Sequence, residues 1–190
     1  MSHIPFSTLF GSDYLLIIIN YFAVYKQFIT FAKKGNMKRV IFLDIDGVLN
    51  VYCEGRDKYG CTFHTHFEDN LHDLIEATGA EIVISSTWRY SGLKVMKNMW
   101  RDRGLAGKVI DITPIIHDGV RGDEIDYWLR ENQVDSYVII DDDDDMLPEQ
   151  MEHFVKTSEN HDHIDKVDFG YGLTKECTRK AISILMGSIG

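Results

Sequence analysis

Short apolar runs alternate with amphipathic segments along the chain from residue 37 onward. Four runs in which apolar residues dominate predict strands: Arg39–Leu43, Glu81–Ile84, Lys108–Ile112 and Ser136–Ile140. The first two are apolar enough to be buried strands. Four segments with apolar residues at helical spacing predict helices: Asp69–Thr78, Ser91–Arg103, Arg121–Glu131 and Thr174–Met186. This alternation predicts an α/β fold, a Rossmann-like three-layer α/β/α sandwich with a mostly parallel sheet.

Residues 1–36 differ in character from the rest of the chain. An apolar run over residues 14–32, interrupted by a few polar positions, nearly reaches the roughly 20 residues that span a bilayer. Basic residues follow it, so an anchor formed by this run would leave the next domain in the cytoplasm. A packed N-terminal helix and a natural start at Met37 are the alternatives, and we favour the start at Met37. Each of them leaves one domain over residues 37–190.

Composition and charge narrow the function classes. The chain has 190 residues, of which 44% are hydrophobic, and this suits a single domain with a packed core. Its formal net charge is -10, and residues 1–36 contribute +2, so the domain that follows carries -12. Such a charge argues against a surface that coats nucleic acid and limits any contact to a chain end. The three cysteines fit a reducing, cytoplasmic compartment better than a disulfide framework.

Polar residues stand directly after three of the predicted strands. Asp44 and Asp46 follow the first strand, and Ser85 and Ser86 follow the second. Five consecutive aspartates, 141–145, follow the fourth. Parallel α/β sheets bind ligands beyond the carboxyl ends of their strands, so we expect these side chains to meet at one edge.

The chemistry expected at that edge is phosphoryl transfer. Carboxylates from two strands repel one another unless a cation lies between them, and oxygen-only ligands suit Mg²⁺ or Ca²⁺. Asp44 and Asp46 point the same way in an extended chain, so one can attack a phosphorus while the other handles a proton. Arg121 and the hydroxyls of Ser85 and Ser86 would neutralise charge on the transferring group.

Four segments, in this order along the chain, resemble the motifs of haloacid dehalogenase-like (HAD) phosphatases: Val40–Asn50, Val83–Arg89, Arg121 and Ile139–Met146. The combination of Asp-Gly-Val-Leu-Asn, Ser-Ser-Thr-Trp-Arg and a polyaspartate strand end is similar to the HAD domain of Swiss Army Knife RNA repair proteins. The resemblance covers nearly all of the chain after residue 36.

The resemblance implies a Mg²⁺-dependent phosphatase that works through an aspartyl-phosphate. Asp44 would be the nucleophile and a metal ligand. Asp46 would be the general acid and base, with its backbone carbonyl on the metal. Asp141 would complete the metal site, and Asp145 would be the second acidic position. Asp142 competes for either role, because five identical residues leave the register open.

The remaining motif positions each keep two candidates. Ser85 would hold the phosphoryl oxygen, and Ser86 is the other possible match. Arg121 would stabilise the transferring group, with Lys156 as the second candidate for the motif cation.

Two further features lie next to these motifs. Trp88 and Arg89 either clamp a substrate base or form a packed tryptophan beside an ion-paired arginine. The segment after the first motif contains cysteines and histidines at spacings that match no usual zinc site, so it is interpreted as an active-site flap: Cys53, Cys61, His64 and His66.

The layout leaves room for minimal or no cap, since residues 51–67 form only a short flap. An open site admits a bulky phosphorylated substrate, and the resemblance favours a polynucleotide end, such as a terminal phosphate on RNA. A phosphotransferase on the same scaffold and a catalytically silent metal-binding interaction domain are the alternatives. Membrane contact is expected only if residues 14–32 act as an anchor.

Overall fold

The computed structural model describes residues 37–157 and 171–187. The apolar segment 1–36 lies outside the described residues, so its role and the proposed domain boundary remain predictions. Within the described part of the chain, no helix is both long and apolar enough to cross a membrane.

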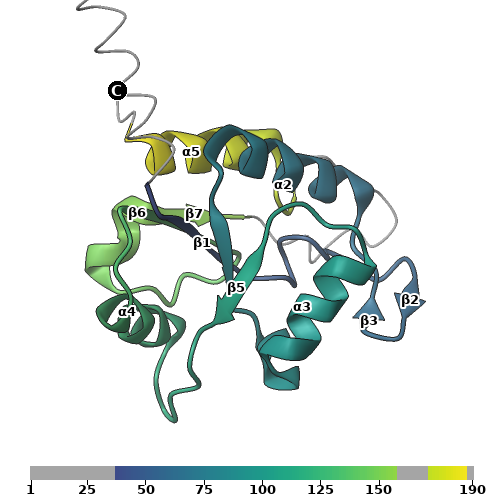
Figure 1. The fold of residues 1–190 in the computed structure, drawn as a ribbon, viewed down its shortest axis with the longest axis horizontal. Helices are drawn as coiled ribbons and strands as arrows, with labels where there is room; N and C mark the ends of the chain where they lie inside the picture. Colours follow the sequence, from purple (N-terminus) through teal and green to yellow (C-terminus); the bar gives the residue numbers. More distant parts are fainter. Residues whose placement is uncertain (1–36, 158–170, 188–190) are drawn as a thin grey trace, which may run out of the picture. The chain divides into compact units, whose positions relative to one another are not determined.

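Five parallel strands form one sheet in the order β5–β4–β1–β6–β7 (Figure 1). Their bounds are Arg39–Leu43 for β1, Glu81–Ile84 for β4, Val109–Ile112 for β5, Ser136–Asp141 for β6 and Phe154–Lys156 for β7. The four predicted strands are all present, and the predicted parallel α/β architecture is confirmed. The sequence pattern missed β7, because a three-residue strand is too short to show a period.

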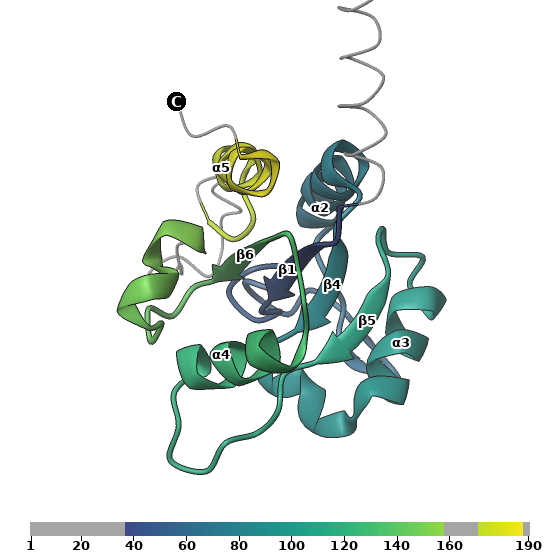
Figure 2. The same ribbon diagram turned by 60° about the vertical axis from the view of Figure 1, so that its left-hand side comes forward.

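Helices cover both faces of the sheet, as Figure 2 shows. Helices α2 (Thr65–Thr78) and α5 (Lys175–Met186) lie on one face, and α4 (Arg121–Glu131) lies on the other. Successive side chains of β1 alternate between the two layers, because strand side chains point to opposite faces in turn. Ile41 and Leu43 join the core under α2 and α5, whereas Val40 and Phe42 join the core under α4.

Helix α3 (Leu93–Asp102) begins later than the sequence predicts. The sequence predicts a helix from Ser91, but Ser91 is the last residue of a 3-10 helix, η2 (Thr87–Ser91), which comes first. The side chain of Ser86 caps η2 by accepting a hydrogen bond from the backbone N–H of Trp88. Gly92, at a φ of 88° that few other residues adopt, then turns the chain into α3.

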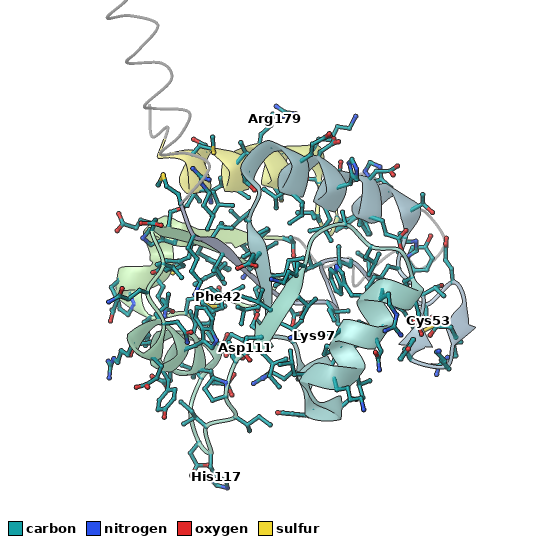
Figure 3. The ribbon with its side chains drawn as sticks, in the orientation of Figure 1. Phe42, Cys53, Lys97, Asp111, His117 and Arg179 are labelled. Atoms are coloured by element: carbon teal, nitrogen blue, oxygen red, sulfur yellow. A yellow bond between two sulfur atoms is a disulfide. The ribbon has the colours of Figure 1, made fainter. Side chains whose placement is uncertain are left out.

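A small hairpin, β2 (Arg56–Asp57) and β3 (Gly60–Cys61), stands between β1 and α2. It forms the predicted flap, and residues 51–64 contain no larger insertion that would make a cap domain. A disulfide joins Cys53 to Cys61, and Cys53 is labelled beside the hairpin in Figure 3. The expectation that the cysteines are unpaired is therefore wrong for these two, and it failed because a lone pair eight residues apart has no spacing signature.

The hairpin is fastened to the end of α3. Arg103 donates two hydrogen bonds to the carboxylate of Asp57, at 2.9 and 3.0 Å, and a third to the backbone carbonyl of Cys61. Asp102 accepts from the hydroxyl of Tyr59 at 2.6 Å and from the ammonium of Lys58 at 2.8 Å. These contacts connect two segments more than 40 residues apart and fix the flap against the body of the domain.

We predict that alkylation of the denatured, non-reduced protein modifies one cysteine per chain, and that prior reduction raises this to three. Cys177 is the free thiol. The paired variant Cys53→Ser with Cys61→Ser should lose about 2 kcal/mol of unfolding free energy in urea, because closing a short loop removes that much entropy from the unfolded chain. Three adducts without reductant, counted by mass spectrometry, would contradict the disulfide.

Candidate active site

Parallel strand register places the predicted site residues at one edge of the sheet. Leu43 on β1 pairs with Ile84 on β4 and with Ile140 on β6. The residues that follow these positions therefore emerge side by side, and they are Asp44, Ser85 and Asp141. The backbone ladder continues into them, since the N–H of Asp44 donates to Ile140 at 3.0 Å and that of Ser85 to Leu43 at 3.0 Å.

Three carboxylates form a cluster at this edge: Asp44, Asp141 and Asp142, with one oxygen from each lying within 4.8 Å of the others. Asp141 is fully buried and Asp44 is 5% exposed. Asp142 reaches the cluster beside Gly47, where a Cβ would lie 2.2 Å from its carboxylate carbon. Gly47 also has a φ of 70°, so the turn after the first motif requires glycine on both grounds.

Burial sets the protonation of the cluster. Burial raises the pKa of Asp44 to about 6, and the nearby charge of Arg121 opposes this rise. Burial and then the charge of Asp44 raise the pKa of Asp141 to about 8. The site therefore holds carboxylates that resist losing their protons until positive charge is supplied.

Arg121, the first residue of α4, supplies such charge. Its Nη1 donates to Asp44 at 2.9 Å and to Asp141 at 2.5 Å. Lys156, the other candidate for the motif cation, pairs instead with Asp144 at 2.9 Å, and both of those side chains are at least half exposed. The structure thus places Arg121, and not Lys156, against the buried carboxylates.

Asp145 lies apart from the cluster. Its carboxylate accepts the backbone N–H of Arg121 at 3.1 Å, and its carbonyl accepts the N–H of Gly122 at 3.1 Å. It therefore caps the start of α4 and fixes the position of Arg121, as negative groups at helix N-termini do.

The two serines have different surroundings, although both are fully buried. The Ser86 hydroxyl lies close enough to Asp44 to lower the pKa of that carboxyl, and its oxygen accepts the backbone N–H of Trp88. The Ser85 hydroxyl has no hydrogen-bond partner within the described residues. Ser86 is accordingly the hydroxyl that contacts the predicted nucleophile.

Asp46 is exposed and does not join the cluster of three. One carboxylate oxygen accepts from the indole N–H of Trp88 at 2.8 Å, and the other accepts from the side-chain amide of Asn50 at 2.9 Å. Sequence reasoning considered Trp88 only as a substrate clamp or a core residue, and it did not consider Asn50. The approach of Trp88 across 42 positions leaves no local pattern in the sequence.

A buried ion pair lies beneath the site. Arg89, 3% exposed, donates to the carboxylate of Glu124 and to the backbone carbonyls of Ser85 at 2.6 Å and Ser86 at 2.9 Å. The interpretation of Arg89 as an ion-paired packing residue is confirmed. Because Glu124 stands in the first turn of α4, this pair couples the serine turn to the helix that carries Arg121.

Residues 40–162 match the sequence profile of a family described as the HAD domain in Swiss Army Knife RNA repair proteins. No curated protein gives a significant match. A solved HAD superfamily (subfamily III A) hydrolase from Legionella pneumophila is similar over 90% of this chain and 92% of its own, at 16% identity and a TM-score of 0.39. The profile match extends over every residue of the edge described above.

In the absence of divalent cations, we predict that the free energy of unfolding falls as the pH rises from about 4 to about 8. An unfolded aspartate ionises near pH 4, while burial holds the pKa of Asp141 near 8, so over this range the folded chain keeps a proton that the unfolded chain loses. Asp141→Asn should remove much of the fall, and Asp73→Asn, at an exposed position on α2, should not. Urea titrations at several pH values measure this. Equal slopes in the two variants would contradict it.

Proposed function

Because the chain belongs to the family of HAD domains in Swiss Army Knife RNA repair proteins, we propose that it hydrolyses a phosphate monoester with Mg²⁺, through an aspartyl-phosphate on Asp44. One observation carries the proposal: three carboxylates converge at the carboxyl edge of the sheet, and Arg121 is bonded to two of them. A separate carboxylate, Asp46, lies two residues beyond the nucleophile and is exposed to an incoming substrate.

The carboxylate cluster fits a magnesium ion. Its donors are all oxygens, they come from two strand ends, and they lie within 4.8 Å of one another. Asp44, Asp141 and Asp142 would hold the ion through their side chains, and the family resemblance adds the backbone carbonyl of Asp46. When bound, Mg²⁺ supplies positive charge that favours the ionised carboxylates and offsets the charge of a substrate phosphate.

The chain's own groups then account for the two proton transfers. An oxygen of Asp44 forms a bond to phosphorus as the bond from phosphorus to the leaving oxygen breaks, and Asp46 gives that oxygen a proton. Asp46 next takes a proton from water as the water oxygen attacks the phosphorus, which frees Asp44 and releases inorganic phosphate. Arg121, which donates to Asp44, and the Ser86 hydroxyl beside that carboxylate offset charge on the phosphoryl oxygens.

The family and the open edge favour a terminal phosphate on RNA as the substrate. The segment between β1 and α2 contributes only the small hairpin, so a bulky chain can approach. Although the molecule is acidic, helix α3 bears a row of exposed cations, among them Lys97, which Figure 3 shows on α3: Lys94, Lys97 and Arg101. This row could contact a few backbone phosphates and would provide only local binding.

We predict phosphate release from 3′- or 5′-phosphorylated RNA oligonucleotides, faster than from small phosphorylated metabolites. Asp44→Asn should lower the rate at least about 1,000-fold, because the nucleophile is lost. Asp143→Asn, an exposed neighbour of the cluster, is the matched control and should stay near the wild-type rate.

Each other outcome of this assay assigns a different function. Substantial activity in Asp44→Asn would refute the aspartyl-phosphate. Transfer of phosphate to an added alcohol would indicate a phosphotransferase, and no release from any substrate would indicate a silent metal-binding domain. Preference for a small metabolite would contradict the RNA end.

We predict that Mg²⁺ raises the melting temperature, and that Asp142→Asn raises the half-saturating Mg²⁺ concentration by roughly tenfold, since one charged ligand is removed. Asp143→Asn removes the same charge one residue along, outside the cluster, and should leave that concentration unchanged. Thermal denaturation at increasing Mg²⁺ concentrations measures this. Equal shifts of the half-saturating concentration in both variants would show that Mg²⁺ binding depends on overall charge and not on the cluster.

A further inference from the structure

The carboxylate of Asp46 is held by two side chains that no catalytic role explains. Trp88 Nε1 donates to Oδ2 at 2.8 Å, and Asn50 Nδ2 donates to Oδ1 at 2.9 Å. Because each oxygen has its own donor, the carboxylate group cannot rotate without breaking a hydrogen bond. An exposed, unrestrained aspartate would instead sample several rotamers.

Trp88 is itself held in place from several sides. Its ring lies 5.7 Å, centroid to centroid, from that of Phe63, and the guanidinium of Arg103 lies 5.7 Å from the ring. A Cβ on Gly60, in the hairpin, would stand 3.2 Å from the edge of the indole, so hairpin backbone lies directly against the ring. The hairpin is in turn fixed by its disulfide to Cys53 and by Arg103.

We propose that Trp88 is a positioning residue, which keeps the Asp46 carboxylate aimed at the leaving oxygen, and that the hairpin supports the indole from behind. The inference rests on the proposed function, in which Asp46 is the general acid. A proton donor accelerates reaction only when it stands within hydrogen-bond reach of the atom it protonates, so loss of aim costs rate without removing the acid. The alternative is a purely structural role, in which Trp88 only packs against Phe63.

The dependence of rate on leaving group separates these two roles. Alkoxide is a poor leaving group and needs a proton, whereas p-nitrophenolate departs without one. In Trp88→Phe, kcat/KM for an alkyl phosphate should fall about 10- to 100-fold, while kcat/KM for p-nitrophenyl phosphate stays within about threefold of wild type. This ratio reports the step in which the first product leaves, so slower hydrolysis of the aspartyl-phosphate does not obscure it.

Trp100→Phe is the matched control. Trp100 packs on the same Phe63 ring, with 6.4 Å between the ring centroids. Its indole N–H donates to the backbone carbonyl of Ala106 and not to a site residue. It should change kcat/KM for both esters by the same factor. If Trp88→Phe also lowers both equally, Trp88 only packs and the inference is wrong. If the wild-type protein releases phosphate neither from these esters nor from phosphorylated RNA, the proposed function fails instead.

A second measurement tests the contact without any activity. Each of the three tryptophans donates a hydrogen bond from its indole N–H. Trp88 donates to Asp46, Trp100 to a backbone carbonyl and Trp128 to Asp111. In Asp46→Ala, the indole N–H resonance of Trp88 should shift, and the other two should not. A Trp88 resonance that does not move would overturn the inference, whatever the enzyme assay shows.

Discussion

The structure depends on gathering like charge in a place that water does not reach. Asp141 is fully buried and Asp44 nearly so, and Asp142 completes a cluster that would repel itself without positive charge. Parallel strands make the gathering unavoidable, because their carboxyl ends share an edge. The guanidinium of Arg121 meets the two most buried carboxylates in the described structure, and a divalent ion could take over part of that role.

Much of the surrounding structure serves to place that guanidinium. Asp145 binds the backbone at the start of α4, and the side-chain amide of Gln150 donates to the carbonyl of Gly122 at 2.9 Å. Glu124, one turn into the same helix, pairs with Arg89 in the interior, and Arg89 holds the carbonyls of the serine turn. The strand ends and the helix that carries the cation are therefore coupled through buried charge. A substitution that displaces one of them also displaces the other.

How much of the structure could be predicted from the sequence depends on how far apart along the chain the interacting residues lie. Strand β1 and helix α4 were predicted with correct bounds, because burial periodicity is local. The edge residues followed from strand topology. The roles of Asp142 and Asp145 could not be separated, since five identical residues leave a strand with no period to mark which one faces inward. The disulfide, the partner of Arg89 and the Trp88 contact were not predicted, because each joins positions that no local pattern links.

The contrast between Asp44 and Asp46 shows how one short turn would serve the two chemical tasks proposed for it. The two side chains are two residues apart, yet one lies buried beside Arg121 and the other stands exposed under a tryptophan N–H. Groups of the same type take different roles when their environments differ. Here the charge of Arg121 offsets that of Asp44, whereas directional hydrogen bonds restrain Asp46. Gly47 permits this difference between the two side chains, because its positive φ turns the chain immediately after Asp46. Its missing Cβ also leaves room for the Asp142 carboxylate beside it. A nucleophile needs the shielded position, and a proton carrier needs access to both substrate and water.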